Sequence, residues 1–225
     1  MILGAFGDSF IYGSDLQDCT DVVASANTWP SLLANRLEMH YECNAYPGIG
    51  NHQILNRLID RLGDYDFYVI SWTWIDRFDY VDTKTDNWQT IRPTHDNKKI
   101  DDFYYRNLHS ELSDKQRTLG IIYQAISLLK DHNCKYLMTY QDPLILDQQW
   151  HCPRNVKLLQ SKIKNDLNTI NGMTFLEWAK SNQMKISDNL HPLEDAHKIA
   201  AKFWLPSVNQ LLNTHAKEDY LHAFK

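Results

Sequence analysis

The sequence predicts an α/β protein built around a parallel sheet, and two observations support this class. Short apolar runs rich in β-branched and aromatic residues alternate with stretches of helical periodicity, which is the pattern of repeated β-α-β units. The run over 67–72 is almost entirely apolar, as expected of a strand that helices cover on both faces. The 225 residues suffice for one sizeable domain, and no repeat, low-complexity tract or linker divides them. We therefore predict a single domain over 1–225.

The predicted strands are short and spaced by helix-sized segments. Residues 2–6 form the first strand, because this apolar run leads directly into a Gly-Asp turn. The other strands are predicted at 41–45, 67–72, 135–140 and, as a short fifth strand, 173–176.

Apolar residues at helical spacing fill the segments between these strands. The first helix begins after Thr28 as its N-cap, with Pro30 in its first turn. A long helix begins after Ser113 as its N-cap and runs towards Lys130. Further helices are predicted at 52–62, 155–167 and 193–212, the last bent near Pro206 and carrying His197 on its surface.

Residues 78–112 interrupt the alternation of strands and helices. They are polar and charged, contain many aromatic residues and show no clear period. A loop of this length inside a compact domain is usually a functional lid or a small subdomain. We expect 78–112 to be such an insertion.

The composition excludes several classes of partner. A net charge of −5 without a basic run argues against nucleic acid and anionic membranes. No apolar stretch approaches the length of a membrane span, and the first residues lack the basic region of a signal peptide. The sequence therefore predicts a cytoplasmic protein and leaves its oligomeric state open.

The four cysteines are scattered without a Cys-x-x-Cys pair, so we expect reduced thiols rather than a disulfide framework. The ten histidines show none of the spacings that are typical of a metal site. We expect neither a metal nor a cofactor.

Two short motifs at opposite ends of the chain carry side chains suited to nucleophilic catalysis. Gly7-Asp8-Ser9 follows the first predicted strand, and Asp188-Asn189-Leu190-His191-Pro192 precedes the last predicted helix. A serine hydroxyl is a weak nucleophile at neutral pH and needs a base within hydrogen-bond reach. A histidine supplies that base, and a carboxylate can hold the imidazole in the required tautomer.

These motifs resemble those of the SGNH (GDSL-type) hydrolases, a family of esterases, lipases, thioesterases and carbohydrate deacetylases. The resemblance extends from residue 7 to residue 192. It implies a flavodoxin-like three-layer α/β/α sandwich with a five-stranded parallel sheet. It also implies that Ser9 is the nucleophile, His191 the general base and Asp188 the carboxylate that orients it.

The second family motif is a glycine after the second strand, and it is similar to Pro47-Gly48-Ile49-Gly50-Asn51. The resemblance implies an oxyanion hole built from the backbone N–H groups of Ser9 and one of these glycines. Gly48 is the first candidate and Gly50 the second, because a residue without a side chain lets the backbone approach a ligand closely.

The third motif departs from the family pattern. The family has Gly-x-Asn-Asp after the third strand, and its asparagine donates a further hydrogen bond to the oxyanion. Here the segment over 71–77 contains no asparagine, and the Thr73 hydroxyl or an indole N–H is the available substitute. Losing one oxyanion donor typically costs about 10²–10³ in rate.

The resemblance implies a serine hydrolase that cleaves a carboxylic ester, either of a small molecule or of a carbohydrate. Aromatic side chains, including Trp88, are numerous, and their flat faces suit stacking on sugar rings, which favours removal of O-acetyl groups. The candidate substrate-binding residues are Asn51, Trp72, Trp74 and Arg77. For Arg77 a structural ion pair is the alternative.

The missing asparagine favours a second hypothesis, a non-catalytic binding module on the same fold, for glycans or another ligand. The two hypotheses differ in geometry. A Ser9 Oγ more than about 4 Å from the His191 ring nitrogen favours the binding module.

Overall fold

The computed structural model describes residues 1–93 and 98–222. Its centre is a five-stranded sheet in the order β2-β1-β3-β6-β7, and every neighbouring pair of strands is parallel. The strands are β1 (Ile2–Phe6), β2 (His40–Cys43), β3 (Phe67–Trp72), β6 (Tyr136–Tyr140) and β7 (Leu167–Asn168). The predicted α/β class with a parallel sheet is confirmed.

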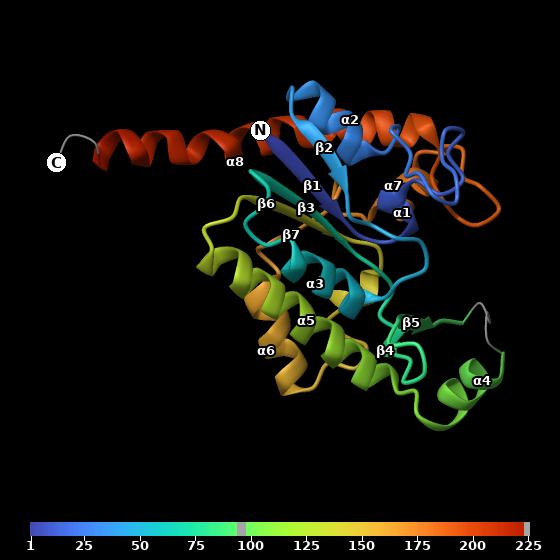
Figure 1. The fold of residues 1–225 in the computed structure, drawn as a ribbon. Coiled ribbons are helices and arrows are strands. Elements are labelled where there is room, and N and C mark those ends of the chain that lie inside the picture. The colour runs from blue at the N-terminus through green and yellow to red at the C-terminus, as the bar shows by residue number, and fades with distance from the viewer. Residues whose placement is uncertain (94–97, 223–225) are drawn as a thin grey trace.

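Helices cover both faces of the sheet (Figure 1). On one face lie α2 (Trp29–Arg36), α7 (Phe175–Ser181) and α8 (Glu194–His222), which pack in one core cluster around Trp29 and Trp204. On the other face lie α3 (Asn51–Asp60), α5 (Glu111–Asp131) and α6 (Arg154–Ile163), which share a second core cluster. The three-layer sandwich implied by the sequence is therefore present. Within the described part of the chain, no helix combines the length and apolar character that crossing a membrane requires.

The prediction of a strand at 173–176 is wrong. The fifth strand is β7, which begins at the last residue of the helix predicted over 155–167, and helix α6 ends earlier, at Ile163. The Thr174 hydroxyl accepts a hydrogen bond from the N–H of Glu177 (3.3 Å), and the Glu177 carboxylate accepts one from the N–H of Thr174 (2.9 Å). This capping box begins helix α7 at Phe175, so the apolar residues there face the core from a helix.

Other boundaries differ by smaller amounts. Helix α5 begins at Glu111, because Ser110 and not Ser113 is its N-cap; the Ser110 hydroxyl accepts a hydrogen bond from the N–H of Ser113. Helix α8 continues through Pro206 to His222 instead of ending near 212. A short 3₁₀ helix, η1 (Pro143–Ile145), follows β6.

The insertion over 78–112 folds as a hairpin followed by a helix. Strands β4 (Phe78–Val81) and β5 (Trp88–Ile91) pair antiparallel, and α4 (Lys98–Asn107) follows. The hairpin is anchored by Asp79, which accepts hydrogen bonds from the N–H groups of Gly50 (2.9 Å) and Gln53 (3.0 Å). Asp79 thereby caps the N-terminus of α3, of which Gly50 is the N-cap residue.

Strand β1 lies between β2 and β3, so the order of the strands reverses at β1. In open parallel sheets, ligands bind beyond the carboxyl ends of the strands at such a reversal. The segments after these three strands carry Ser9, Gly48 and Thr73 respectively. The topology therefore gathers the three predicted motifs at one edge of the sheet.

Candidate active site

Ser9 begins the short helix α1 (Ser9–Tyr12), directly after β1. Asp8 is the N-cap of this helix, and its carboxylate accepts a hydrogen bond from the N–H of Phe10 (3.0 Å). A side chain at Gly7 would place a Cβ 2.6 Å from Ile11 and 3.1 Å from the carbonyl oxygen of Ser71, so glycine permits the sharp turn. Ser9 is 6% exposed and held by a turn that leaves it little freedom.

The Ser9 hydroxyl and the His191 imidazole are in direct contact. The Oγ of Ser9 lies 2.9 Å from Nε2 of His191. On the other side of the ring, Nδ1 of His191 lies 2.7 Å from Oδ2 of Asp15. With the ring in the Nδ1–H tautomer, Nδ1 donates to Asp15 and Nε2 accepts from the hydroxyl. Phe10 packs edge-to-face against the imidazole, with 5.2 Å between the ring centroids, and this contact helps to hold the plane of the His191 ring.

The carboxylate that contacts His191 is that of Asp15, and the prediction of Asp188 is corrected. Asp188 is exposed and makes no side-chain hydrogen bond or ion pair within the described residues. The reason is the path of the loop, in which the N–H of Ser187 donates to the carbonyl of His191 (2.9 Å) and Leu190 adopts a positive φ of 65°. This tight turn points Asp188 outward while the imidazole faces the turn after α1.

The same loop encloses the Asp15 carboxylate. The Ser187 hydroxyl donates to it at 2.6 Å and the Asn189 amide at 3.1 Å, in addition to the imidazole. Partial burial raises the pKa of Asp15, but these hydrogen bonds more than offset it, so the net pKa is lowered from its usual value. Asp15 is therefore ionised at neutral pH. Its side chain is 29% exposed.

Sequence reasoning missed Asp15 because nothing in its local pattern marks it. It lies six positions after Ser9 in a polar turn, and its φ of 70° is visible only in the structure. Asp tolerates this left-handed conformation better than most residues, but the sequence does not reveal that position 15 adopts it.

The backbone N–H groups of Ser9 and Gly48 both lack a hydrogen-bond acceptor among the described residues. Gly48 has a φ of 80°, which favours glycine. Its loop lies beside the Ser9 turn, because the N–H of Tyr46 donates to the carbonyl of Gly7 (3.1 Å). The N–H of Gly50, the second candidate, is occupied by Asp79. A Cβ at Gly50 would lie 2.6 Å from Oδ2 of Asp79, so Gly50 makes room for that carboxylate.

Thr73 has no free donor for an oxyanion in this structure. Its hydroxyl donates to Asp8 Oδ2 at 2.6 Å, and its N–H donates to the Asn51 side-chain oxygen at 2.8 Å. The Asn51 amide in turn donates to the carbonyl of Thr73 at 3.2 Å. Both side chains are buried, so the predicted roles of Thr73 in the oxyanion hole and of Asn51 in substrate binding are corrected to structural ones.

Arg77 and Trp72 are also structural. The Arg77 guanidinium, 11% exposed, forms an ion pair with the fully buried Asp8 (3.1 Å) and donates to the carbonyl of Ile49 (2.8 Å). Trp72 is fully buried in the core. Trp74 is only partly buried and packs against the core cluster around Trp29, so its role in substrate binding stays a prediction.

His197 is buried, contrary to the expectation of a surface position. Its Nδ1 accepts a hydrogen bond from the N–H of Trp29 at 2.9 Å, and its ring packs edge-to-face on Phe175. Complete burial lowers the pKa of His197 to about 3, with a smaller opposing effect from a hydrogen bond to the backbone of Pro192. His197 is therefore neutral and links the N-terminus of α2 to the residue after His191.

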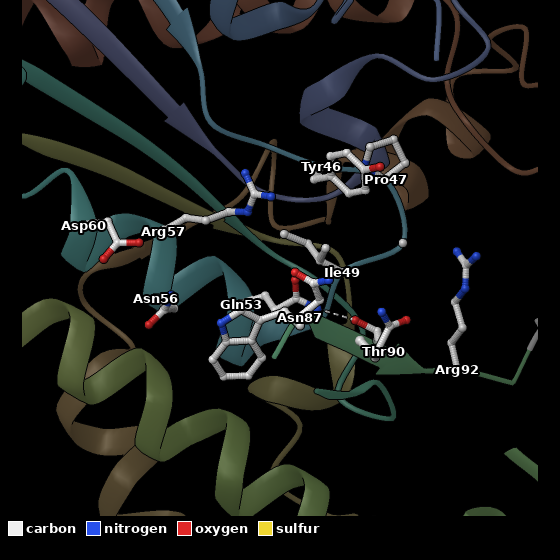
Figure 2. Close-up of a pocket in the computed structure, with 13 residues that line it drawn as sticks. Tyr46, Pro47, Ile49, Gln53, Asn56, Arg57, Asp60, Asn87, Thr90 and Arg92 are labelled. Carbon is white, nitrogen blue, oxygen red and sulfur yellow. Dashed lines mark hydrogen bonds between the residues drawn. The ribbon is translucent and has the colours of Figure 1, made fainter. Parts of the chain in front are cut away.

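A cleft of about 590 Å³ has Gly48 among its lining residues (Figure 2). The turn at Tyr46 to Ile49, helix α3 and strand β5 form its walls. Its volume is within the range of small-molecule sites. The lining combines aromatic side chains, amides and charges: Tyr46, Gln53, Asn56, Arg57, Asp60, Asn87, Trp88, Gln89 and Arg92. Gly48 thus borders both the cleft and the Ser9 turn.

The three-layer fold with its five-stranded parallel sheet matches that of solved SGNH hydrolase structures. Solved structures of similar fold include two esterases and a protein named TesA. The psychrotrophic esterase EstA from Pseudoalteromonas sp. has a TM-score of 0.54 and 13% identity, covering 95% of this chain and 99% of EstA. TesA has a TM-score of 0.55 and 15% identity, covering 94% and 99%. The acetyl xylan esterase AlAXEase has a TM-score of 0.50 and 14% identity, covering 92% and 100%.

No family model matches the sequence, and no curated protein matches it. The structural similarity extends over nearly the whole chain and confirms the fold that the motifs predicted. At these identities it establishes the fold alone, and the assignment of an activity depends on the side chains described above.

Proposed function

We propose that this protein is a serine hydrolase that cleaves carboxylic esters, with Ser9 as nucleophile, His191 as general base and Asp15 as the carboxylate that orients it. The observation that carries the proposal is the continuous chain of contacts from Ser9 Oγ to His191 (2.9 Å) and from His191 to Asp15 (2.7 Å). The two distances are those of formed hydrogen bonds, which a binding module has no need to maintain.

In the acylation step, Ser9 Oγ attacks the ester carbonyl carbon and its proton passes to Nε2 of His191. The imidazolium is stabilised by the ionised Asp15 and then protonates the departing alkoxide as the carbonyl–oxygen bond breaks. Water attacks the resulting acyl-enzyme, loses a proton to His191, and the acid leaves as Ser9 regains its hydrogen. The low pKa of Asp15 keeps this carboxylate charged through the cycle.

The oxyanion that forms during each attack requires hydrogen-bond donors. The N–H groups of Ser9 and Gly48 are the candidates, since neither has another acceptor among the described residues. Because Thr73 supplies no donor, we expect a rate about 10²–10³ below that of a site with a third donor.

The cleft beside Gly48 supports a carbohydrate ester as substrate, with an O-acetyl group as the acyl part. Tyr46 and Trp88 contribute aromatic surface to the cleft. The Trp88 ring packs edge-to-face against His52, with 5.1 Å between the ring centroids. The amides of Asn56, Asn87 and Gln89 make no side-chain hydrogen bonds within the described residues, so they can bind hydroxyl groups. Aromatic surface with convergent amides is suited to a sugar ring.

The test is labelling with a fluorophosphonate probe, followed by peptide mass spectrometry and assays on acetylated sugars. We expect labelling at Ser9 and hydrolysis of acetyl esters by the wild type. Ser9→Ala should lose both, whereas Ser161→Ala, which changes an exposed serine on α6, should retain both. A folded wild type that neither reacts with the probe nor releases acetate would contradict the proposal.

The engaged Thr73 donors favour one alternative, a binding module that retains the fold without useful turnover. The same experiment separates the two. Retention of an acetylated sugar without release of acetate by the wild type would favour the binding module.

A further inference from the structure

The cleft beside Gly48 is lined by more basic than acidic side chains, whereas the chain as a whole has more acidic than basic residues. Its lining contains two arginines, Arg57 and Arg92, and a single acidic residue, Asp60. The whole chain has a net charge of −5. A positively charged cleft on an acidic protein attracts anions and concentrates them locally. The charge of this cleft therefore indicates what kind of ligand it accepts.

Arg57 is placed to bind a ligand group rather than to support the fold. It projects from α3, and its guanidinium carbon lies 5.5 Å from the centre of the Tyr46 ring. Its one hydrogen bond in the described structure is a long contact to the carbonyl of Asn44 (3.4 Å). Unlike Arg77, it forms no ion pair with a carboxylate of the described residues. A guanidinium oriented by an aromatic ring keeps donors available for a carboxylate or phosphate.

Arg92 lies at the Gly48 turn. A Cβ at Gly48 would overlap Nη1 of Arg92, so the guanidinium packs directly on the glycine Cα. Figure 2 shows Arg57 and Arg92 on opposite sides of the cleft, with the Tyr46–Pro47 turn between them. A ligand group bound by Arg92 therefore lies next to the residue whose N–H we assign to the oxyanion hole.

The walls that hold these arginines are rigidly connected. Asp79 on β4 accepts from the N–H groups of Gly50 and Gln53 and from the Thr90 hydroxyl (2.6 Å). The Gln53 amide also donates to Thr90 at 2.7 Å. These bonds fix the hairpin that carries Arg92 to the helix that carries Arg57, and such preorganisation reduces the entropy cost of binding.

We propose that the cleft is an anion-recognising subsite, and that the substrate is an acylated sugar bearing a negatively charged group bound by Arg57 and Arg92. This inference rests on the proposed ester hydrolysis for its link to Ser9, but the binding itself does not require catalysis. The shared chemistry of the charged group is that of a carboxylate or a phosphate, both of which arginine binds with paired hydrogen bonds.

The binding arm of the test uses Ser9→Ala protein, in which no turnover intervenes. Isothermal titration with glucuronic acid, glucose 6-phosphate and glucose compares a carboxylate, a phosphate and a neutral hexose of similar size. We expect one or both anions to bind about tenfold more tightly than glucose or better, as hydrogen bonds to charged groups allow. The anion that binds more tightly identifies the source of the charge.

The kinetic arm uses the wild-type serine with O-acetylated glucuronic acid and O-acetylated glucose. Arg57→Gln and Arg92→Gln should each lower the ratio of kcat/KM for the acid over the neutral sugar about tenfold. Arg36→Gln, which removes an exposed arginine on α2, is the matched control and should leave the ratio unchanged.

The two arms separate failure of the subsite from failure of the proposed function. Equal affinity for glucose and both anions would overturn the anion subsite even if esters are hydrolysed. Anion binding that is unchanged when Arg57→Gln or Arg92→Gln is added to the Ser9→Ala protein would overturn it as well. If no ester is hydrolysed but Ser9→Ala protein binds an anion through Arg57 and Arg92, the subsite stands and the hydrolase proposal falls.

Discussion

Two groups of polar residues hold Ser9, and they differ in burial and in what they can do. Beneath the serine, the fully buried Asp8 is bound by Thr73, Arg77 and the N–H of Phe10. At the rim, the partly exposed Asp15 is bound by the loop that carries His191. The two carboxylates are seven positions apart in the sequence. The partners of the buried Asp8 are themselves buried or mostly buried, whereas Asp15 contacts the imidazole that we propose as the general base.

The difference teaches that a buried carboxylate with several hydrogen-bond partners is structural even when it is adjacent in sequence to the candidate nucleophile Ser9. Asp8 joins the segments after β1 and β3, and Arg77 extends this connection to Ile49 after β2. In the proposed mechanism Asp15 stabilises a charge that appears on His191, and a partly exposed carboxylate can fulfil that role. We expect substitutions in the two groups to affect different quantities.

The largest expected effect is at the rim. Asp15→Asn should lower kcat for 4-nitrophenyl acetate by on the order of 10⁴-fold, because an amide no longer favours the Nδ1–H tautomer or stabilises the imidazolium. Asp188→Asn is the matched control and should retain wild-type activity, since Asp188 is exposed. The reverse result, with Asp188→Asn inactive and Asp15→Asn active, would restore the original assignment from sequence.

The next effect is in the buried group. Asp8→Ala should reduce the free energy of unfolding by about 3–5 kcal/mol, because it leaves the mostly buried Arg77 cation without its carboxylate. Urea unfolding of this variant and of Asp21→Ala, at an exposed aspartate, measures the difference. A loss of stability as small as that of Asp21→Ala would mean that Arg77 reaches solvent and that the connection is not structural.

The smallest expected effect is on the pH dependence of the free energy of unfolding, and it arises from the buried His197. Between the normal pKa of 6.5 and the folded value of about 3, His197 is protonated only in the unfolded state. The unfolded state therefore binds more protons, and stability falls as pH falls, by about 1.4 kcal/mol per unit from this group. His197→Asn, which keeps an acceptor for the N–H of Trp29, should show a shallower decrease.

Urea unfolding at neutral pH and at about pH 5.5 tests this sign, because the window lies below the normal histidine pKa. His40→Asn, at an exposed histidine, should keep the wild-type slope. An unchanged slope in His197→Asn would show that His197 becomes protonated without unfolding.

The sequence by itself determined the class of fold and the two residues, Ser9 and His191, that meet in the candidate active site. Strand and helix periodicities are local, so β1, β3 and the alternation of elements could be predicted from neighbouring residues alone. Ser9 and His191 were predicted because their motifs match a family pattern, and their contact at 2.9 Å agrees with it. The start of α7 is also encoded locally, by the capping box of Thr174 and Glu177.

Only the tertiary structure decided which carboxylate faces His191, which glycine N–H is free and which arginines line the cleft. Asp188 is adjacent to His191 in sequence, whereas Asp15 is 176 positions away. Gly50 and Gly48 look alike until Asp79 from the hairpin occupies one of them. Arg57 and Arg77 differ in that, among the described residues, only Arg77 forms an ion pair with a carboxylate. Each distinction depends on the approach of distant segments, and a side chain's role is set by the partners that this approach leaves within hydrogen-bond distance.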